Sequence, residues 1–101
     1  MLALFLISVG AGQSKEANIF YKEEILPVLK SNCVKCHGPD KQKGDVRLDI
    51  LSTDFLNDRG AAEIWHDASD QIKLGEMPPE GEKALSSKER RLLTEWIDSN
   101  L

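Results

Sequence analysis

Only two cysteines and six aromatic side chains occur in the 101 residues of this chain. Two cysteines are too few for a disulfide framework or for a four-cysteine zinc site. Positive charge is scarce as well, because 13 Lys and Arg oppose 17 Asp and Glu and leave a net charge of −4. A surface that binds nucleic acid is normally basic, so this balance argues against nucleic acid as a partner.

The hydrophobic residues available to form a core are also limited. The chain is 41% hydrophobic and 30% charged, which is typical of one small globular domain. A chain of this length must offset roughly 1.5 kcal/mol of ordering entropy per residue, and it comes near zero net stability without a staple. A covalently attached cofactor is one way to supply the missing core.

The first residues have a different composition. Residues 1–7 are an unbroken apolar run, small residues follow it, and no charged side chain precedes Lys15. The run is shorter than the roughly 20 apolar residues of a membrane-spanning helix. This pattern is typical of a secretory signal peptide, here without the usual positively charged start. We expect residues 1–11 to be a signal peptide, with a buried N-terminal helix as the alternative. Residues 12–101 then form a domain that is periplasmic or otherwise exported and is not stably inserted in a membrane.

Helical periodicity predicts two helices in the first three quarters of the chain. The first spans residues 19–30 and contains Pro27, which lacks an amide proton, so a kink or restart is expected near Leu26. The second spans residues 61–74, where Gly75 provides a natural stop. Between them, residues 46–50 alternate apolar and polar side chains, which predicts an extended segment that covers apolar surface.

The third helix is expected to begin after Ser86. Ser86 and Glu89 have the spacing of a capping box. An apolar stripe follows, made of Leu92, Leu93, Trp96 and Ile97. One extended segment cannot form a sheet by itself, so the sequence predicts an all-α fold of three main helices.

Residues 33–37 read C-V-K-C-H, which is the C-x-x-C-H haem-attachment motif. Two thiols three positions apart on a helical turn can each add to one vinyl group of the same porphyrin. The imidazole of the next residue is then held beside the iron. The sequence therefore predicts one haem c, bound covalently through Cys33 and Cys36, with His37 as the proximal iron ligand.

Three other interpretations of the motif were weighed. A thioredoxin-like redox pair would follow a strand in a βαβ unit, and no such unit is visible. A zinc site would need Cys33, Cys36, His37 and His66, and the adjacency of Cys36 and His37 makes this a poor tetrahedral clamp. A disulfide across two residues would be strained and would close a very small loop.

A haem held by His37 has a sixth iron position to fill. The candidates are Met77, His66, Met1 or no residue at all. Pro78 and Pro79 stiffen the polar loop that contains Met77, and this loop can present the thioether sulfur from the opposite face. Packing into the core is the alternative role for Met77, but a polar loop suits that role badly. His66 is expected to be exposed on the second helix.

Charged and apolar residues around the motif lead to three further expectations. Four cations lie near it in sequence: Lys35, Lys41, Lys43 and Arg47. They either form an ordinary solvated surface or steer a redox partner with an acidic docking surface, and Arg47 is also a candidate to pair with a haem propionate. A backbone carbonyl in the loop after Gly38 is expected to accept a hydrogen bond from the free His37 nitrogen. The candidates for the haem and core lining are Ile25, Leu29, Leu48, Ile50, Ile64, Trp65, Leu93 and Trp96.

Further short motifs lead to a family. They are G-P-D-K at residues 38–41, G-D-V-R-L-D at 44–49, G-E-M-P-P at 75–79 and L-T-E-W-I at 93–97. With C-V-K-C-H, they resemble the planctomycete-type cytochrome c domain over about residues 20–101. The resemblance implies a small helical cytochrome c fold wrapped around a covalently attached haem. It further implies that Cys33 and Cys36 bind the haem and that His37 and Met77 are its axial ligands. Members of the family often form the N-terminal module of larger multidomain proteins.

Three functions follow from these residues. The leading one is one-electron transfer to or from a redox partner protein outside the cytoplasm, without catalysis by the chain itself. The second is a haem-based gas or redox sensor in which Met77 leaves the iron. The third is an interaction domain stapled by a metal without haem.

Overall fold

The structure is a computed structural model that describes residues 14–101. Every regular element in this part of the chain is helical, so the predicted all-α class is confirmed. The predicted signal peptide at residues 1–11, and Met1 as a candidate iron ligand, lie outside the described residues. Among the described helices, none is long and apolar enough to cross a membrane.

The N-terminal part of the fold is one helical rod in three sections: α1 (Lys15–Phe20), η1 (Tyr21–Ile25) and α2 (Leu26–Asn32). Ser14 caps its start, because the Ser14 hydroxyl accepts a hydrogen bond from the Ala17 amide at 3.0 Å. The rod starts earlier and ends later than the predicted residues 19–30. The reason is that a polar cap, rather than apolar periodicity, determines where the helix begins.

A wide helical turn precedes Pro27. The Leu26 amide donates to the Tyr21 carbonyl, five residues back, and α2 then begins at Leu26 with Pro27 in its first turn. Pro27 has no amide proton with which to continue an α-helical ladder, and a π-type turn shifts that ladder by one residue. The predicted restart near Leu26 is therefore confirmed.

The second and third predicted helices are α3 (Arg59–Lys73) and α4 (Ser87–Asn100). Asp58 starts α3, where its side chain accepts a hydrogen bond from the Ala61 amide at 3.0 Å. The capping box at the start of α4 is confirmed, because Ser86 Oγ accepts from the Glu89 amide at 3.0 Å and Glu89 Oε1 accepts from the Ser86 amide at 2.9 Å.

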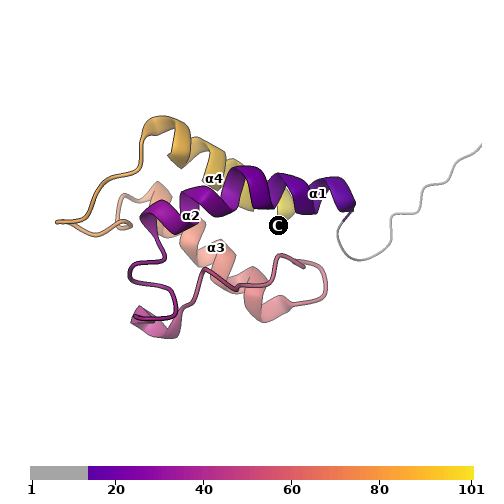
Figure 1. The fold of residues 1–101 in the computed structure, drawn as a ribbon, viewed down its shortest axis with the longest axis horizontal. Coiled ribbons are helices and arrows are strands. Elements are labelled where there is room, and N and C mark those ends of the chain that lie inside the picture. The colour runs from indigo at the N-terminus through magenta and orange to yellow at the C-terminus, as the bar shows by residue number, and fades with distance from the viewer. Residues whose placement is uncertain (1–13) are drawn as a thin grey trace, which may run out of the picture.

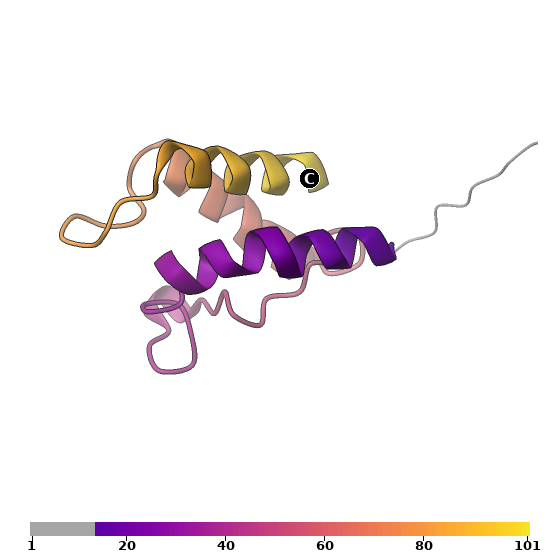
Figure 2. The same cartoon turned by 45° about the horizontal axis from the view of Figure 1, so that its top comes forward.

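The helices and loops are arranged at two ends of the molecule. Figure 1 shows α4 running antiparallel to the α1–η1–α2 rod, with α3 crossing both. The loop after α2 and the loop between α3 and α4 lie together at the end opposite the C-terminus, as Figures 1 and 2 both show. The fold thus brings the two segments with candidate haem ligands to one end.

The core lies where the rod, α3 and α4 meet. Its most deeply buried apolar side chains are Ile25, Leu29, Trp65, Leu93 and Ile97. Trp65 and Trp96 form an edge-to-face pair with ring centroids 5.0 Å apart, and Tyr21 and Phe55 extend this aromatic cluster. Such pairs contribute about 0.5–1.5 kcal/mol beyond their buried area.

Most of the predicted core lining is confirmed. Ile25, Leu29, Leu48, Trp65 and Leu93 are buried, while Ile64 and Trp96 are partly buried against the core. The prediction for Ile50 is wrong, because its side chain is 67% exposed. The backbone bends over residues 48–50, so the alternation of inward and outward side chains stops at Leu48.

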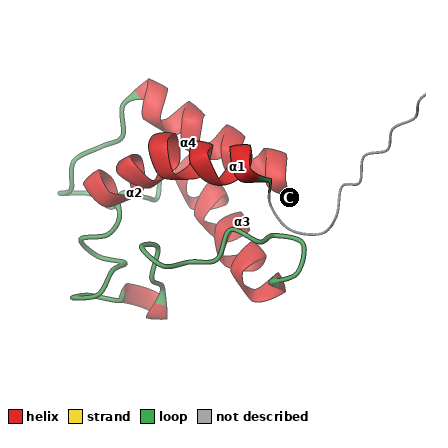
Figure 3. Cartoon of the chain, turned by 45° about the vertical axis from the view of Figure 1, so that its right-hand side comes forward, coloured by secondary structure: helices red, strands yellow, loops and turns green. Residues whose placement is uncertain are grey.

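The loop after α2 is shaped by turns rather than by a strand. A short 3-10 turn, η2 (Lys43–Asp45), precedes the predicted extended segment, which is extended at Val46 and packs Leu48 into the core. In the secondary-structure view of Figure 3, the described chain contains only helices and loops. The segment therefore covers apolar surface as expected, without a partner strand.

Candidate functional site

The C-x-x-C-H motif continues the last turn of α2. The Cys33 amide donates to the Leu29 carbonyl at 2.8 Å, and the His37 amide donates to the Cys33 carbonyl at 3.0 Å. Both cysteines therefore sit on one helical turn, as attachment of two thiols to a single porphyrin requires. We call residues 32–37 the cysteine wall of the site.

Gly38 allows the chain to turn sharply after the motif. A Cβ atom at this position would lie 2.4 Å from the Val34 carbonyl oxygen and 2.5 Å from Val34 Cγ1. Only glycine fits such a close approach to another backbone segment. The return of the chain then places the Leu48 amide 2.7 Å from the His37 carbonyl, so the backbone of His37 is held on both sides.

Met77 is positioned by the C-terminus of α3. Gly75, with a φ of 78°, ends the helix in a Schellman motif, in which the Gly75 amide donates to the Ile72 carbonyl and the Glu76 amide donates to the Gln71 carbonyl. The Met77 amide also donates to the Gln71 carbonyl, at 3.2 Å. The backbone of Met77 is thereby fixed directly to α3. We call residues 75–85 the Met77 loop.

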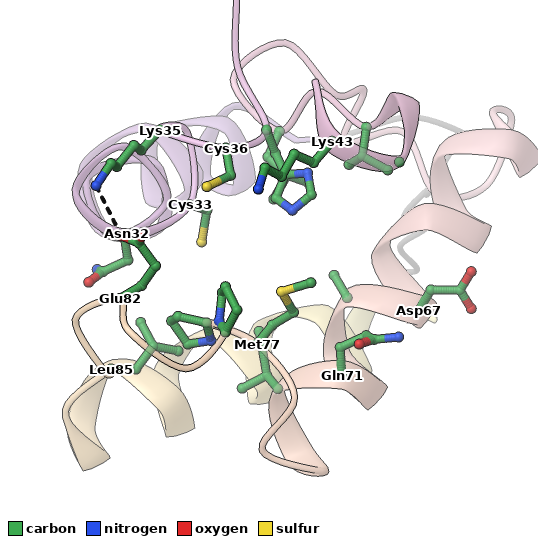
Figure 4. Close-up of a pocket in the computed structure, with 18 of the residues that line it drawn as sticks. Asn32, Cys33, Lys35, Cys36, Lys43, Asp67, Gln71, Met77, Glu82 and Leu85 are labelled. Carbon is green, nitrogen blue, oxygen red and sulfur yellow. Dashed lines mark hydrogen bonds and ion pairs between the residues drawn. The ribbon is translucent and has the colours of Figure 1, made fainter. Parts of the chain in front are cut away.

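A cavity of about 340 Å³ separates the cysteine wall from the Met77 loop. Cys33, Cys36, His37 and Met77 all line it. Figure 4 shows the sulfur atoms of Cys33 and Cys36 on one side of the cavity and that of Met77 on the opposite side. The remaining lining is largely apolar and includes Val46, Leu48, Ile64, Ala68, Ile72, Pro78, Pro79 and Leu85. Cavities of this size and character are typical of cofactor sites.

The donor atoms around this cavity fit a covalently bound haem. His37 Nδ1 is buried, and no hydrogen-bond partner for it exists within residues 14–101. A buried polar atom without a partner costs about 1–3 kcal/mol, so the His37 ring at this cavity has a hydrogen-bonding nitrogen that the described chain does not use. Two thiols, one imidazole and one thioether are the side chains that attach and ligate haem in c-type cytochromes.

The predicted carbonyl partner of the free His37 nitrogen is not provided. The carbonyl groups of Lys41 and Gln42, in the loop after Gly38, accept hydrogen bonds from backbone amides of the same loop. The turn therefore satisfies its own backbone and leaves Nδ1 without an acceptor.

The environment of Cys33 perturbs its thiol. Burial, together with the nearby charge of Glu89 and the neighbouring Cys36, raises the pKa of the Cys33 thiol to about 11. Cys33 is therefore protonated at neutral pH in the absence of a bound group. Both cysteines are free, which does not fit the disulfide interpretation.

The cations near the motif are partly neutralised. Arg47 forms a two-point contact with Asp49, through Nε at 3.1 Å and Nη2 at 2.5 Å, and this contact lowers the pKa of Asp49. Arg47 does not line the cavity, so the interpretation that pairs it with a propionate is not supported. Lys35 pairs with Glu82 at 3.1 Å. Lys41 and Lys43 have no ion pair within the described chain. Lys35 and Lys43 line the cavity, whereas Lys41 does not.

His66 is remote from the candidate site. It lies on the exposed face of α3, near Asp67 and Asp70 at 3.6 and 3.7 Å, and its side chain is 58% exposed. Among residues 14–101, no three His, Cys, Asp or Glu side chains come together in a way that could hold a metal ion. The zinc interpretation, which needs His66 beside Cys33, therefore has no geometric support.

Several residues of the site were not singled out from the sequence. Ala68 and Gln71 line the cavity on the face of α3 next to the buried face, and Leu85 lines it from the far end of the Met77 loop. Their helical spacing from Ile64 would have identified the two α3 residues, since positions four and seven residues apart share one helix face. No sequence signal identifies Leu85.

A helical domain with a C-x-x-C-H turn facing a methionine across an apolar cavity has the layout of a c-type cytochrome. The family model of planctomycete cytochrome C matches residues 33–81, a segment that contains all four candidate ligands. The match to this segment confirms the resemblance to the planctomycete-type cytochrome c domain. Haem as the cofactor and electron transfer as the kind of function are supported by the same match. No curated protein and no solved structure matches the chain significantly.

Proposed function

We propose that the chain is a single-haem c-type cytochrome that transfers one electron at a time outside the cytoplasm. The observation that carries this proposal is the cavity lined by Cys33, Cys36 and His37 on one side and by Met77 on the other. Bound haem would supply an iron that takes up and releases one electron. This role fits a carrier rather than a catalyst, because two protein ligands leave no iron position for a substrate.

Each of the four side chains has its own part in the proposal. Cys33 and Cys36 hold the porphyrin through two thioether bonds, and His37 and Met77 bind the iron from opposite sides. A thioether sulfur is a weak, soft donor, so Met77 favours the ferrous state and raises the reduction potential. The apolar lining from α3 and the extended segment excludes water from the site, which also affects the potential.

The exported location and the redox partner remain part of the proposal. A signal peptide at residues 1–11 would direct the chain out of the cytoplasm, and covalent haem attachment requires both thiols to be reduced when they react. Lys41 and Lys43, the cations near the motif without an ion pair in the described residues, would steer an acidic partner to this end of the molecule.

Two measurements test the proposed function. Expression with cytochrome maturation machinery should give an intact mass that includes one porphyrin, and Cys33→Ala with Cys36→Ala should abolish it. The ferrous protein should show a low-spin spectrum that carbon monoxide changes only slowly, because Met77 must first leave the iron, whereas Met77→Ala should bind the gas rapidly. A colourless product with the mass of the polypeptide alone would refute the proposal, and gas binding by the unmodified chain as rapid as that of Met77→Ala would instead indicate a sensor.

A further inference from the structure

Two polar contacts connect the cysteine wall to the segment that follows Met77. Lys35 Nζ lies 3.1 Å from Glu82 Oε1 in the Met77 loop. Asn32 Nδ2 donates to Glu89 Oε2 in the first turn of α4, at 3.3 Å. In Figure 4 the Lys35–Glu82 contact is drawn at the edge of the cavity, beside Cys33. The two contacts thus bridge the walls on the side where the porphyrin would be attached.

The Met77 loop has firm anchors at its two ends only. At one end the Met77 amide donates to the Gln71 carbonyl of α3, and at the other end the Ser86 cap starts α4. Between these anchors, the backbone hydrogen bond found in the described chain is local, from the Glu82 amide to the Pro79 carbonyl at 3.1 Å. The ion pair between Lys35 and Glu82 therefore connects the middle of this loop to the cysteine wall.

Whether the exposed Lys35–Glu82 pair affects the Met77 loop depends on where the pair lies in the structure. The Lys35 and Glu82 side chains are 73% and 35% exposed, and pairs of this kind contribute little to global stability. A loop that opens locally is different, because the pair is formed in the closed loop and lost in the open one. The whole of its small free energy then acts on the ratio of closed to open loop.

We infer that Lys35 and Glu82 are positioning residues that hold the Met77 loop against the cysteine wall and so set how readily Met77 leaves the haem iron. This inference rests on the proposed function, since it assigns Met77 to the iron. Lys35 and Glu82 themselves do not bind the haem in this scheme. They act through the position of the loop, and the Asn32–Glu89 contact supports the same closure from α4.

The experiment uses the haem-loaded full chain and carbon monoxide as the probe. The rate of gas binding to the ferrous protein reports how often Met77 leaves the iron. Lys35→Glu and Glu82→Lys should each raise this rate about two- to five-fold, which corresponds to an exposed ion pair. The double exchange, Lys35→Glu with Glu82→Lys, should return the rate to that of the unmodified chain. High salt should raise the rate of the unmodified chain and lower the rates of the single variants, because it screens the attraction in the first and the like-charge repulsion in the others.

Lys30→Glu is the matched control, because it makes the same change of charge in an exposed lysine of α2 that has no ion pair within the described residues. It should leave the gas-binding rate unchanged. Equal rates in the single variants and the unmodified chain, or the same increase in Lys30→Glu, would overturn the inference. The proposed function fails separately, through a missing porphyrin mass or through a Met77→Ala variant that does not gain gas binding.

Discussion

The two ends of this molecule bury their side chains by different means. At the end with the C-terminus, helices pack on helices, and Ile25, Trp65 and Ile97 are completely buried. At the other end, loops from two parts of the chain face each other across a cavity of about 340 Å³. The helical end is complete without any added group, whereas the loop end presents apolar walls that a cofactor would fill. Stability and function are therefore expected to respond to different substitutions at the two ends.

The largest effect is expected in the helical end. Trp65→Ala removes a fully buried ring from the aromatic cluster and the hydrogen bond from Trp65 Nε1 to the Ser52 carbonyl at 2.8 Å. We expect a loss of about 3–5 kcal/mol in the free energy of unfolding, with and without haem. Chemical denaturation measures it, with Ile50→Ala at an exposed position as the control. A small loss would show that the helical end does not carry the stability of the fold.

A smaller effect is expected at the turn that closes the loop end. Gly38→Ala places a methyl group 2.4 Å from the Val34 carbonyl oxygen, so the turn after the motif must shift, at a cost of about 1–3 kcal/mol. The yield of covalently bound haem should fall, as intact mass would show. Gly60→Ala is the control, because Gly60 lies inside α3 with no heavy atom closer than 3.7 Å to the added Cβ. It should stabilise the protein by up to about 1 kcal/mol. Similar behaviour of the two variants would contradict the assigned role of Gly38.

The cap of α4 connects the two ends, and its loss should lower the free energy of unfolding by less than the two preceding substitutions. Ser86→Ala removes the hydroxyl that accepts from the Glu89 amide, which should cost about 1 kcal/mol of stability. Glu89, which also accepts from Asn32, would be less well held, so the rate of carbon monoxide binding should rise slightly as well. Ser87→Ala is the matched control for thermal unfolding. An unchanged melting temperature in Ser86→Ala would show that the cap is not needed.

The smallest effect concerns pH. Hydrogen bonds from Lys73 and then Ser69 lower the pKa of Asp98 below its ordinary value of 3.8. A carboxylate with a lowered pKa in the folded state contributes stability above its unfolded pKa, and this contribution is lost as the pH falls through the folded pKa. Asp98→Asn should therefore lower the free energy of unfolding at pH 7. It should also make that free energy fall less steeply as the pH drops below about 4. Acid titrations followed by circular dichroism would measure it, and an unchanged acid profile would contradict the role of this contact.

The helices could be predicted from the sequence because their signals are local. The Ser86 capping box, the restart after Leu26 and the stop at Gly75 each depend on residues within one or two helical turns. Apolar periodicity does not predict the start of α1 at Lys15, because Ser14 caps a polar segment with no apolar stripe. Ile50 was assigned to the core in error because alternation alone does not reveal a backbone bend.

The candidate haem-binding residues that meet at the cavity could be identified from the sequence, but the contacts that support them could not. C-x-x-C-H has a chemical reason for its spacing, and the prolines after Met77 distinguish it from a core methionine. The Lys35–Glu82 pair joins residues 47 positions apart, and nothing local marks it. Two further contacts likewise depend on how the turns fold in three dimensions. They are the close approach of Gly38 to Val34 and the ion pair between Arg47 and Asp49.

Leu48 and Ile72 belong to the core and also line the cavity. Any group that fills the cavity therefore contacts side chains that also pack in the helical core. Binding of that group is thermodynamically linked to folding for this reason. Heating should therefore loosen both ends together rather than one after the other, and the haem-loaded chain should melt at a higher temperature than the haem-free chain.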